Sequence, residues 1–378
     1  MHVNMVSIDR ESRVSDPAMR ASADHILTYA RDLRGGGVER AQLRLIRGWI
    51  AAGRRVTLLL GSDQGPLAHE LPQGVRIVTG MRWRTLPRLV RDAAPDVIFC
   101  PGNFYTGLAA WLRLRRRGDC PPVVAKMSNA PVRADHGAVM RAVHAGWLAV
   151  HGGFLDHLVA MTPATAADAA RALRMKGRVS VIPNPPALAT GGATPDLPPR
   201  YILGVGRLEP QKRWDRLVAA MPALAGVDLV LLGEGSERGA LTAQIAALGL
   251  ADRVHLRGHV ADPMPAMAGA AVLALTSDFE GVPGVLREAL SVGTPVVATE
   301  SSRAVAEIID TPALGTIVPL DDAAALVAAL RHWMEADRPA PVPQPGADSA
   351  LRYLELFDRL VTARRARPRA QTGARARS

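Results

Sequence analysis

Two glutamates, Glu280 and Glu288, stand eight positions apart with a glycine- and proline-containing turn between them. The apolar run 271–275 predicts a buried strand, so Glu280 follows the carboxyl end of a strand, and Glu288 lies in the helical pattern that comes next. Ligands of open α/β sheets bind at this edge, where a carboxylate can accept hydrogen bonds from sugar hydroxyls. The alternative is a solvated loop residue and a surface helix residue, and the pair on its own favours that alternative.

Arg207 and Lys212 form a second candidate pair. Arg207 comes just after the predicted strand 201–205, and Lys212 follows near a predicted helix start. An arginine can bind phosphate oxygens through two parallel hydrogen bonds, and a lysine adds a point charge. Lys212 is one of three lysines, together with Lys126 and Lys176. An ordinary surface pair is the competing interpretation.

A glycine run at 35–37 follows the predicted first strand and opens the first predicted helix. Glycine permits backbone conformations that bring amide groups close to a ligand. The run is not a G-x-G-x-x-G fingerprint, so it does not indicate a nicotinamide cofactor. A flexible turn is the alternative here.

Short apolar runs alternate with amphipathic helical patterns in both halves of the chain. The predicted strands are 25–29, 56–60, 97–99 and 123–125 in the first half, and 201–205, 227–232, 254–256, 271–275, 295–298 and 315–318 in the second. Helical patterns between them include 39–52 and 106–116. This alternation predicts an α/β protein with two doubly wound parallel sheets.

The length of 378 residues suits two domains better than one core. We expect a first domain at 24–185, a breaker-rich linker at 186–200, a second domain at 201–345 and a terminal helix at 346–363. Residues 1–23 are predicted to be a disordered extension or to precede the true start of translation. Residues 364–378 are predicted to be a disordered basic tail.

Composition narrows the class of protein. A hydrophobic content of 48% with 21% charged residues is typical of globular chains. No apolar run is long enough to span a bilayer, and the amino terminus lacks a secretory pattern. Cys100 and Cys120 lack metal-ligand spacing and are expected to be reduced cytosolic thiols. Asp262 and Asp278 are isolated, so no metal site is predicted.

The net charge of +11 is concentrated in two stretches. Residues 81–118 hold eight arginines and two aspartates, and 361–378 hold six arginines and no acid. Arginines lie beside Trp83 and within 111–117, a combination that suits an anionic membrane surface. A solvated face is the alternative. Nucleic acid would also suit the charge, but no nucleic-acid module is recognisable, so none is predicted.

Five segments together resemble the retaining GT-B glycosyltransferases of glycosyl transferase group 1, family 4. They are 35–40 (GGGVER), 203–212 (LGVGRLEPQK), 231–235 (LLGEG), 254–260 (VHLRGHV) and 279–290 (FEGVPGVLREAL). The last resembles the E-x7-E signature of that family. The segments have the family's order and spacing, and the resemblance covers roughly residues 24–363.

The resemblance implies two Rossmann-like domains facing a cleft, with the donor on the second domain and the terminal helix packed back on the first. It implies that Arg207 and Lys212 grip the donor diphosphate, that Glu280 accepts hydrogen bonds from the donor sugar, and that Glu288 holds the ribose. The implied donor-binding residues are Gly36, Gly37, Gly206, Arg207, Lys212, Gly233, Gly235, His259, Val260, Glu280, Gly281, Val282, Pro283, Gly284, Val285 and Glu288.

The chain departs from the family at one position. Many relatives carry a histidine after the fifth strand, near the reacting sugar, where this chain has Asn129. An amide can hydrogen-bond a sugar hydroxyl but cannot act as a base. The predicted catalytic residues are Arg207, Lys212, Glu280 and, as a hydrogen-bonding group only, Asn129. His136 could also approach the sugar, but a solvent-exposed position is preferred for it.

The implied function is retaining transfer of a hexosyl group from a nucleotide sugar, with a UDP-sugar favoured, to a glycan or lipid-linked acceptor. The setting would be bacterial surface polysaccharide or glycolipid synthesis, without cofactor or metal, in the cytoplasm or on the inner face of the plasma membrane. Two alternatives stay open: a GT-B enzyme that is not a transferase, such as a sugar-nucleotide epimerase or a phosphorylase, and a catalytically idle binding scaffold.

Overall fold

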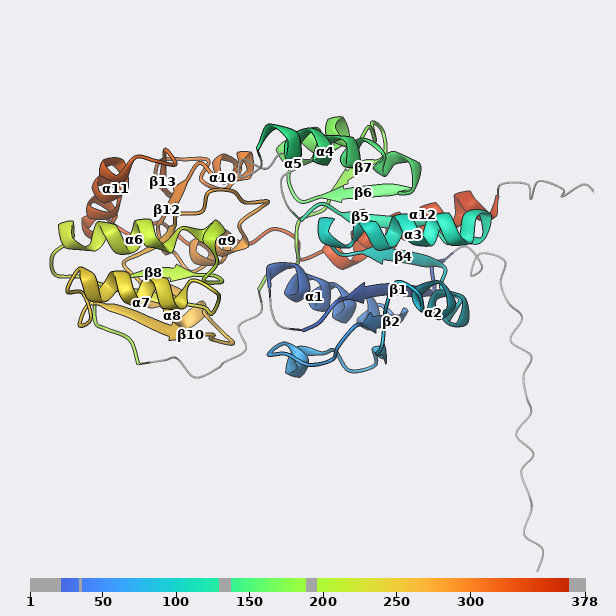
Figure 1. Ribbon diagram of the computed structural model, residues 1–378, viewed down its shortest axis with the longest axis horizontal. Coiled ribbons are helices and arrows are strands. Elements are labelled where there is room, and N and C mark those ends of the chain that lie inside the picture. The colour runs from blue at the N-terminus through green and yellow to red at the C-terminus, as the bar shows by residue number, and fades with distance from the viewer. Residues whose placement is uncertain (1–21, 34–35, 129–136, 188–195, 367–378) are drawn as a thin grey trace, which may run out of the picture.

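The computed structural model describes residues 22–33, 36–128, 137–187 and 196–366, which form two α/β units, each built on a parallel sheet (Figure 1). The first sheet has the order β3-β2-β1-β4-β5-β6-β7. Its strands are β1 His25–Ala30, β2 Arg55–Leu60, β3 Arg76–Val78, β4 Val97–Cys100, β5 Val123–Lys126, β6 His157–Ala160 and β7 Val179–Val181. Its helices are α1 Gly37–Ala51, α2 Leu86–Ala93, α3 Thr106–Arg116, α4 Ala138–Ala149 and α5 Pro163–Ala172.

The second sheet has the order β10-β9-β8-β11-β12-β13. Its strands are β8 Tyr201–Val205, β9 Asp228–Leu232, β10 Val254–Gly258, β11 Val272–Leu275, β12 Val296–Thr299 and β13 Gly315–Val318. Its helices are α6 Trp214–Ala220, α7 Arg238–Ala247, α8 Met264–Gly269, α9 Gly284–Ser291, α10 Arg303–Ile308 and α11 Ala323–Glu335. The last helix of the described residues is α12 Ser349–Arg365. Short 3-10 turns include η2 Ala68–Glu70, η3 Asn103–Tyr105 and η6 Pro210–Lys212.

All ten segments predicted as strands are strands, to within a residue or two at their ends. Three further strands, β3, β6 and β7, were not predicted. β3 and β7 have three residues each, which is too short for a periodic signal, and neither is fully buried. The two edge strands of the first sheet therefore give no sequence pattern, whereas β6, His157–Ala160, lies inside the sheet and was missed although it is largely buried.

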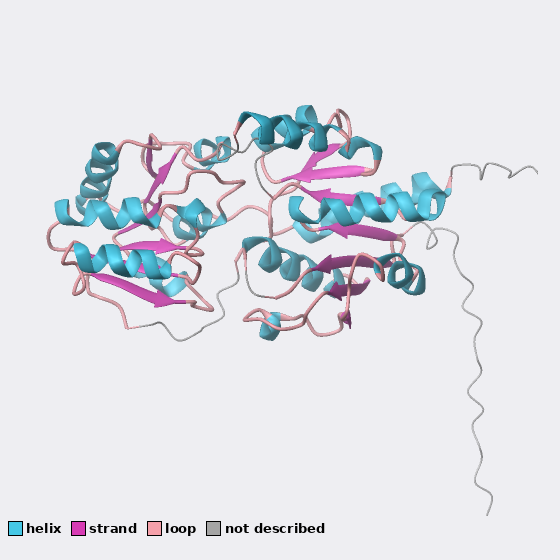
Figure 2. Cartoon of the chain, in the orientation of Figure 1, coloured by secondary structure: helices cyan, strands magenta, loops and turns pink. Residues whose placement is uncertain are grey.

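Strand order reverses at the same point in both sheets, between β1 and β4 and between β8 and β11. Because parallel connections are right-handed, this reversal puts the helices on both faces of each sheet, as Figure 2 shows. The reversal is the topological switch point where doubly wound folds bind ligands. The second and fourth motif segments extend from β8 and β10, and the last follows β11.

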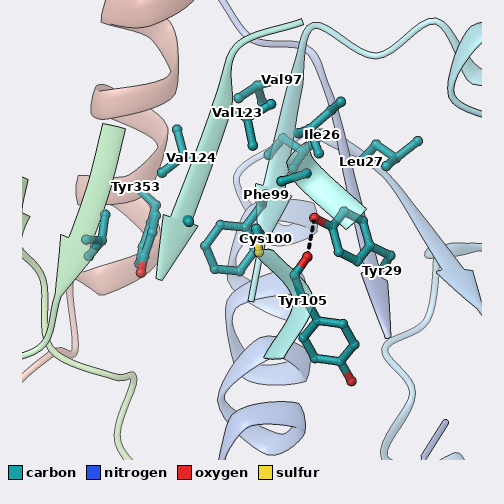
Figure 3. Packing of buried hydrophobic residues seen from close by; sticks show 14 of the residues in the cluster. Ile26, Leu27, Tyr29, Val97, Phe99, Cys100, Tyr105, Val123, Val124 and Tyr353 are labelled. Atoms are coloured by element: carbon teal, nitrogen blue, oxygen red, sulfur yellow. Dashed lines mark hydrogen bonds between the residues drawn. The ribbon is translucent and has the colours of Figure 1, made fainter. Parts of the chain in front are cut away.

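The terminal helix α12 packs on the first domain. Tyr353 and Phe357 join Trp49 of α1 and Phe99 of β4 in a buried aromatic cluster, with ring centroids 5.3 to 6.3 Å apart. Figure 3 shows Tyr353 beside Phe99 in this core. Helix α12 therefore packs against the first domain, although it follows the second domain in the sequence.

The structure differs from the sequence prediction at both ends of the described chain. The expected terminal helix, 346–363, begins instead at Ser349 and continues to Arg365. Arg364 donates to the carbonyl of Gly118 at 2.6 Å, and Arg365 pairs with Asp96 at 2.7 Å, so these two residues are not part of a disordered tail. At the other end Ala23, placed in the predicted extension, is fully buried.

The two cysteines, Cys100 and Cys120, are free and buried. Burial raises the pKa of the Cys100 thiol to about 11, which makes it a poor nucleophile at neutral pH. Among the described residues, no helix is both long and apolar enough to cross a membrane.

Candidate functional site

The two strands that flank the switch point of the second sheet each deliver one predicted site residue. Lys212 follows β8 on η6, and Glu280 follows β11 in the loop before α9. The Lys212 Nζ lies 2.6 Å from Glu280 Oε1, so the structure brings these two predictions into direct contact. Both side chains are largely buried.

Backbone contacts hold the two loops together. The Thr276 hydroxyl donates to the carbonyl of Lys212 at 3.1 Å, and the amide of Asp278 donates to the carbonyl of Gln211 at 2.9 Å. The Gln211 side-chain amide in turn donates to the carbonyl of Phe279 at 2.7 Å. These bonds fix the backbone on either side of Lys212 and Glu280, so the ion pair joins two loops that are already positioned.

Glu280 has two further partners that sequence reasoning missed. The Ser277 hydroxyl donates to Glu280 Oε1 at 2.7 Å, and the Glu280 amide donates to the carbonyl of Ser301 at 3.0 Å. Ser277 and Ser301 lie in loops after β11 and β12, and loop serines carry no distinguishing pattern. The carboxylate is therefore held through Oε1 by the Ser277 hydroxyl and by Lys212, and the Ser301 carbonyl holds the backbone of the same residue.

The glycines of the second and third motifs form a tightly packed pair of turns. Gly206 and Gly233 both have positive φ, of 157° and 153°. A Cβ on Gly233 would lie 1.9 Å from the Gly206 carbonyl oxygen, and one on Gly235 would lie 2.2 Å from that of Leu208. The backbone after β8 thus runs against the backbone after β9, which requires glycine at these positions.

Arg207 is exposed at the end of β8, and its carbonyl accepts a hydrogen bond of 3.0 Å from the Trp214 indole. Within the described part of the chain its guanidinium forms no ion pair, so it is available to an anion. His259 is exposed and Val260 half-buried, in the loop that follows β10. Partial burial and then the charge of Arg40 lower the pKa of His259, which favours a neutral imidazole.

Helix α9 begins directly after the Glu280 loop. Pro283 is its N-cap, and Gly284 and Val285 are its first two residues. A helix amino terminus offers free amide groups and a favourable dipole to an anion. Gly281 and Val282 complete the turn, and the Ser302 hydroxyl donates to the carbonyl of Gly281 at 3.0 Å. The arrangement can hold a phosphate beside Lys212.

Glu288 lies one turn further along α9, with its side chain 20% exposed. Burial raises its pKa, and the charges of Arg44 and Arg40 from the first domain oppose that increase. Arg44 approaches Glu288 Oε1 to 3.7 Å, and Arg40 donates to the carbonyl of Ala261 at 3.2 Å. Helix α1 therefore meets the second domain at this site, as Figure 1 shows for α1 and α9.

The glycine run of the first domain opens α1, whose first residue is Gly37. Gly36 is half-buried, and a Cβ there would lie 2.6 Å from Glu39 Oε2. Gly35 lies outside the described residues, as do Asn129 and His136, so their predicted positions are not tested. Among the described residues, no group of three or more His, Cys, Asp or Glu side chains could hold a metal ion.

Two family models cover most of the chain. Residues 35–187 match the model described as Glycosyltransferase Family 4, and residues 199–336 match the one described as Glycosyl transferases group 1. The chain carries the two domains of a GT-B glycosyltransferase. The five motif segments all fall within these two glycosyltransferase domains, and Lys212, Glu280 and Glu288 belong to the second.

Curated relatives of these glycosyltransferase domains act in bacterial glycan synthesis. A Campylobacter jejuni N-acetylgalactosaminyltransferase acting on a diphospho-undecaprenol substrate is 33% identical over 37% of this chain and 38% of its own length. The lipopolysaccharide core glycosyltransferases LpsE and LpsD of Rhizobium meliloti are 36% and 25% identical, over 26% and 75% of this chain. The matches span 29% of LpsE and 81% of LpsD.

Solved structures show the same GT-B fold. HepE from Anabaena, in complex with UDP and glucose, has a TM-score of 0.70 at 19% identity and covers 90% of this chain and 98% of its own. WaaG, a glycosyltransferase of lipopolysaccharide biosynthesis, has a TM-score of 0.65 at 16% identity, with 91% and 96% coverage. At these identities the likeness establishes the fold alone.

Proposed function

We propose that the chain is a retaining glycosyltransferase that moves a hexosyl group from a nucleotide sugar, with a UDP-sugar favoured, to a glycan or lipid-linked acceptor. The setting is the synthesis of bacterial surface polysaccharide or glycolipid. The observation that carries the proposal is the contact of Lys212 with Glu280 at the switch point, beside the start of α9 and Glu288. The named activities of the bacterial relatives and the UDP bound to HepE support it.

On the donor side, the exposed Arg207 and the loop lysine Lys212 bind the diphosphate, and the free amides at Gly284 and Val285 take its second phosphate. Glu288 accepts hydrogen bonds from the ribose hydroxyls. The turns at 233–235 and 258–260 flank the nucleotide, since glycine permits backbone conformations that bring amide groups close to a ligand.

In the reaction, the bond between the anomeric carbon and the donor phosphate oxygen breaks, and a bond to the acceptor oxygen forms on the same face. The departing phosphate oxygen takes the acceptor proton. Arg207 and Lys212 stabilise the charge that develops on the diphosphate, so no step is assigned to a metal or cofactor. Glu280 holds the sugar hydroxyls and is not a nucleophile. We also propose that Asn129 contacts the sugar or the acceptor.

The acceptor side belongs to the first domain, proposed as 24–185, joined by a linker at 186–200 to the donor domain at 201–345. Domain closure excludes water and limits hydrolysis of the donor. The alternative of an idle scaffold would keep the fold without the fixed charges, whereas here Lys212, Glu280 and Glu288 are all in place.

We also propose peripheral contact with an anionic membrane on its cytoplasmic side. The predicted basic face is only partly available, because Arg113 pairs with Asp156 and Arg115 lies over the Trp111 ring. Helix α4 instead exposes apolar side chains along its length, with Val139 80% and Val143 63% exposed. The exposed apolar set on and just after α4 is Val139, Met140, Val143, Trp147 and Val150. Residues 137–155 include Arg141 and no acid, which suits an anionic surface.

Slow hydrolysis of candidate donors tests the reaction class without knowledge of the acceptor. UDP-glucose, UDP-galactose and UDP-N-acetylglucosamine are incubated with the protein, and proton NMR follows the anomer first released. Retention predicts that an α-linked donor releases the α-sugar before mutarotation. Release of the β-anomer would contradict the retaining mechanism.

A further inference from the structure

Arg44 connects the two domains of the molecule. It lies on α1 of the first domain, and its guanidinium donates to the carbonyl of Pro185, the residue before the linker, at 3.4 Å. The same group lies 3.7 Å from Glu288 Oε1 on α9 of the second domain. The side chain is only 19% exposed, so it is held in this position by its surroundings and is not a mobile surface arginine.

The charges around Glu288 come from several elements. Arg44 and Arg40 face it from α1, and Asp262 faces it from the loop before α8. Glu70, on η2, pairs with Arg40 at 3.2 Å, so it reduces the effect of the Arg40 charge on Glu288. Burial favours the protonated form of Glu288, and Arg44 is the largest opposing influence on its pKa. A neutral carboxyl is a weaker hydrogen-bond acceptor than a carboxylate.

We propose that Arg44 is a positioning residue of the donor site, which orients the Glu288 carboxylate from the opposite domain for its hydrogen bonds with the ribose hydroxyls. The inference rests on the proposed ribose role of Glu288. It implies that the nucleotide site is complete only when the two domains are together, since the carboxylate belongs to one domain and its counter-charge to the other. Donor affinity and domain closure are then coupled through this pair.

Ribose discrimination provides a readout that a merely structural role would not change. The dissociation constants of UDP, GDP and ADP are measured by calorimetry, and the tightest ligand is compared with its 2′-deoxy form. The wild type is expected to prefer the ribonucleotide by about 10-fold, the size of one hydrogen bond to a charged group. Arg44→Ala should remove most of that preference, because it should weaken binding of the ribonucleotide and leave binding of the 2′-deoxy form unchanged. The four dissociation constants, of two proteins with two ligands, then form a double-mutant cycle that measures the coupling between Arg44 and the ribose hydroxyl.

Arg47→Ala is the matched control, because Arg47 lies on the same helix, is exposed and donates only to the carbonyl of Glu70 among the described residues. It should keep the wild-type preference. Arg44→Lys keeps the positive charge but loses the planar guanidinium, so its ribose preference should lie between those of the wild type and Arg44→Ala. If Arg44→Ala does not fold, Arg44→Gln provides the comparison. The acid limb of ribonucleotide binding should also move to higher pH in the Ala or Gln variant.

Two outcomes would overturn the inference alone: equal weakening of both nucleotide forms in Arg44→Ala, or an unchanged ribose preference. In either case nucleotide binding by the wild type leaves the proposed function in place. A wild type that binds none of the three nucleotides would overturn the proposed function, and this inference with it.

Discussion

The ammonium of Lys212 lies 2.6 Å from the Glu280 carboxylate, although 68 residues separate them in the chain. Each group compensates the charge of the other in a largely buried place, where an unpaired charge would be costly. An ammonium has three donors, so Lys212 can keep this contact and still bind a phosphate. The pair is therefore preorganised before a ligand binds, and we expect the two residues to contribute to donor binding together.

The first prediction concerns that pair. Lys212→Met and Glu280→Gln should each lower kcat for donor turnover by about 10²–10³-fold, because each removes part of a preorganised electrostatic site. The double variant should lose little more than the worse single variant, since residues acting as a unit are not additive. Multiplicative losses would show independent roles, and a single variant with wild-type turnover would refute the site assignment.

The second prediction concerns the glycine turns. Gly233→Ala would place a Cβ 1.9 Å from the Gly206 carbonyl oxygen at a φ of 153°, so the turn must move. We expect a loss of about 3 kcal/mol or more in unfolding free energy. Gly239→Ala in α7 meets no atom within 4 Å and should be neutral or slightly stabilising. Equal urea midpoints for the two variants would contradict this packing.

The third prediction is a pH dependence. Lys126 is buried in β5 with Nζ donating to Asn184 Oδ1 at 3.2 Å, and burial lowers its pKa from 10.5 to about 8. Between pH 8 and 10.5 the unfolded state binds more protons than the folded state, so this group makes stability rise with pH in that window. Below pH 8 its contribution is constant.

Lys126→Met removes this titration. The melting temperature of the wild type, measured relative to that of Lys126→Met, should therefore increase as the pH is raised from 8 towards 10.5. Groups common to both proteins cancel in this difference. A difference that is flat or falls over the window would show that the lysine is not held in a desolvated position.

The fourth prediction separates packing from polarity in the aromatic cluster. The Tyr353 hydroxyl is buried and has no hydrogen-bond partner among the described residues. Tyr353→Phe should stabilise the protein by about 1 kcal/mol, since an unsatisfied buried polar group is removed. Phe357→Ala in the same cluster should cost about 3–5 kcal/mol through the cavity it leaves. Destabilisation by Tyr353→Phe in a urea titration would mean that the hydroxyl is bonded in solution.

The fifth prediction tests the proposed membrane contact. Met140→Glu combined with Val143→Glu puts two charges on the exposed apolar face of α4. This variant should lower co-sedimentation with phosphatidylglycerol vesicles at least about 5-fold, because apolar insertion and charge attraction are both lost. Leu351→Glu, at an exposed apolar position on α12, should bind like the wild type. Equal loss of vesicle binding in both variants would contradict the proposed contact through α4. Loss of binding in Leu114→Glu, which changes an exposed position on the basic helix α3, would contradict it as well.

The sequence placed the main site residues correctly relative to the strands. Lys212 and Glu280 follow β8 and β11, as expected, because buried parallel strands are marked by apolar runs and the motifs start where those runs end. The glycines at 233 and 235 were predicted from a motif, and the structure supplies the reason, a backbone contact that leaves no space for a Cβ.

Contacts between distant elements could not be predicted in this way. Arg44 lies in an ordinary amphipathic stretch of α1, and its approach to Glu288 depends on how the two domains meet. The same holds for Ser277 and Ser301, whose roles follow from the loop geometry at the switch point. Local pattern reports which face of an element is buried, but not which element lies against it.

Nucleotide binding is the property on which the proposed donor site depends. The melting temperature of the wild type and of an Arg207→Ala and Lys212→Met double variant is measured with UDP, GDP, ADP and their common sugar conjugates. A ligand that binds only the folded state raises the melting temperature by mass action. We expect a clear increase in the melting temperature with one nucleotide family, and we expect the double variant to lose this increase while it still melts cooperatively. No increase with any of them in a cooperatively melting wild type would contradict the transferase account and favour an idle scaffold.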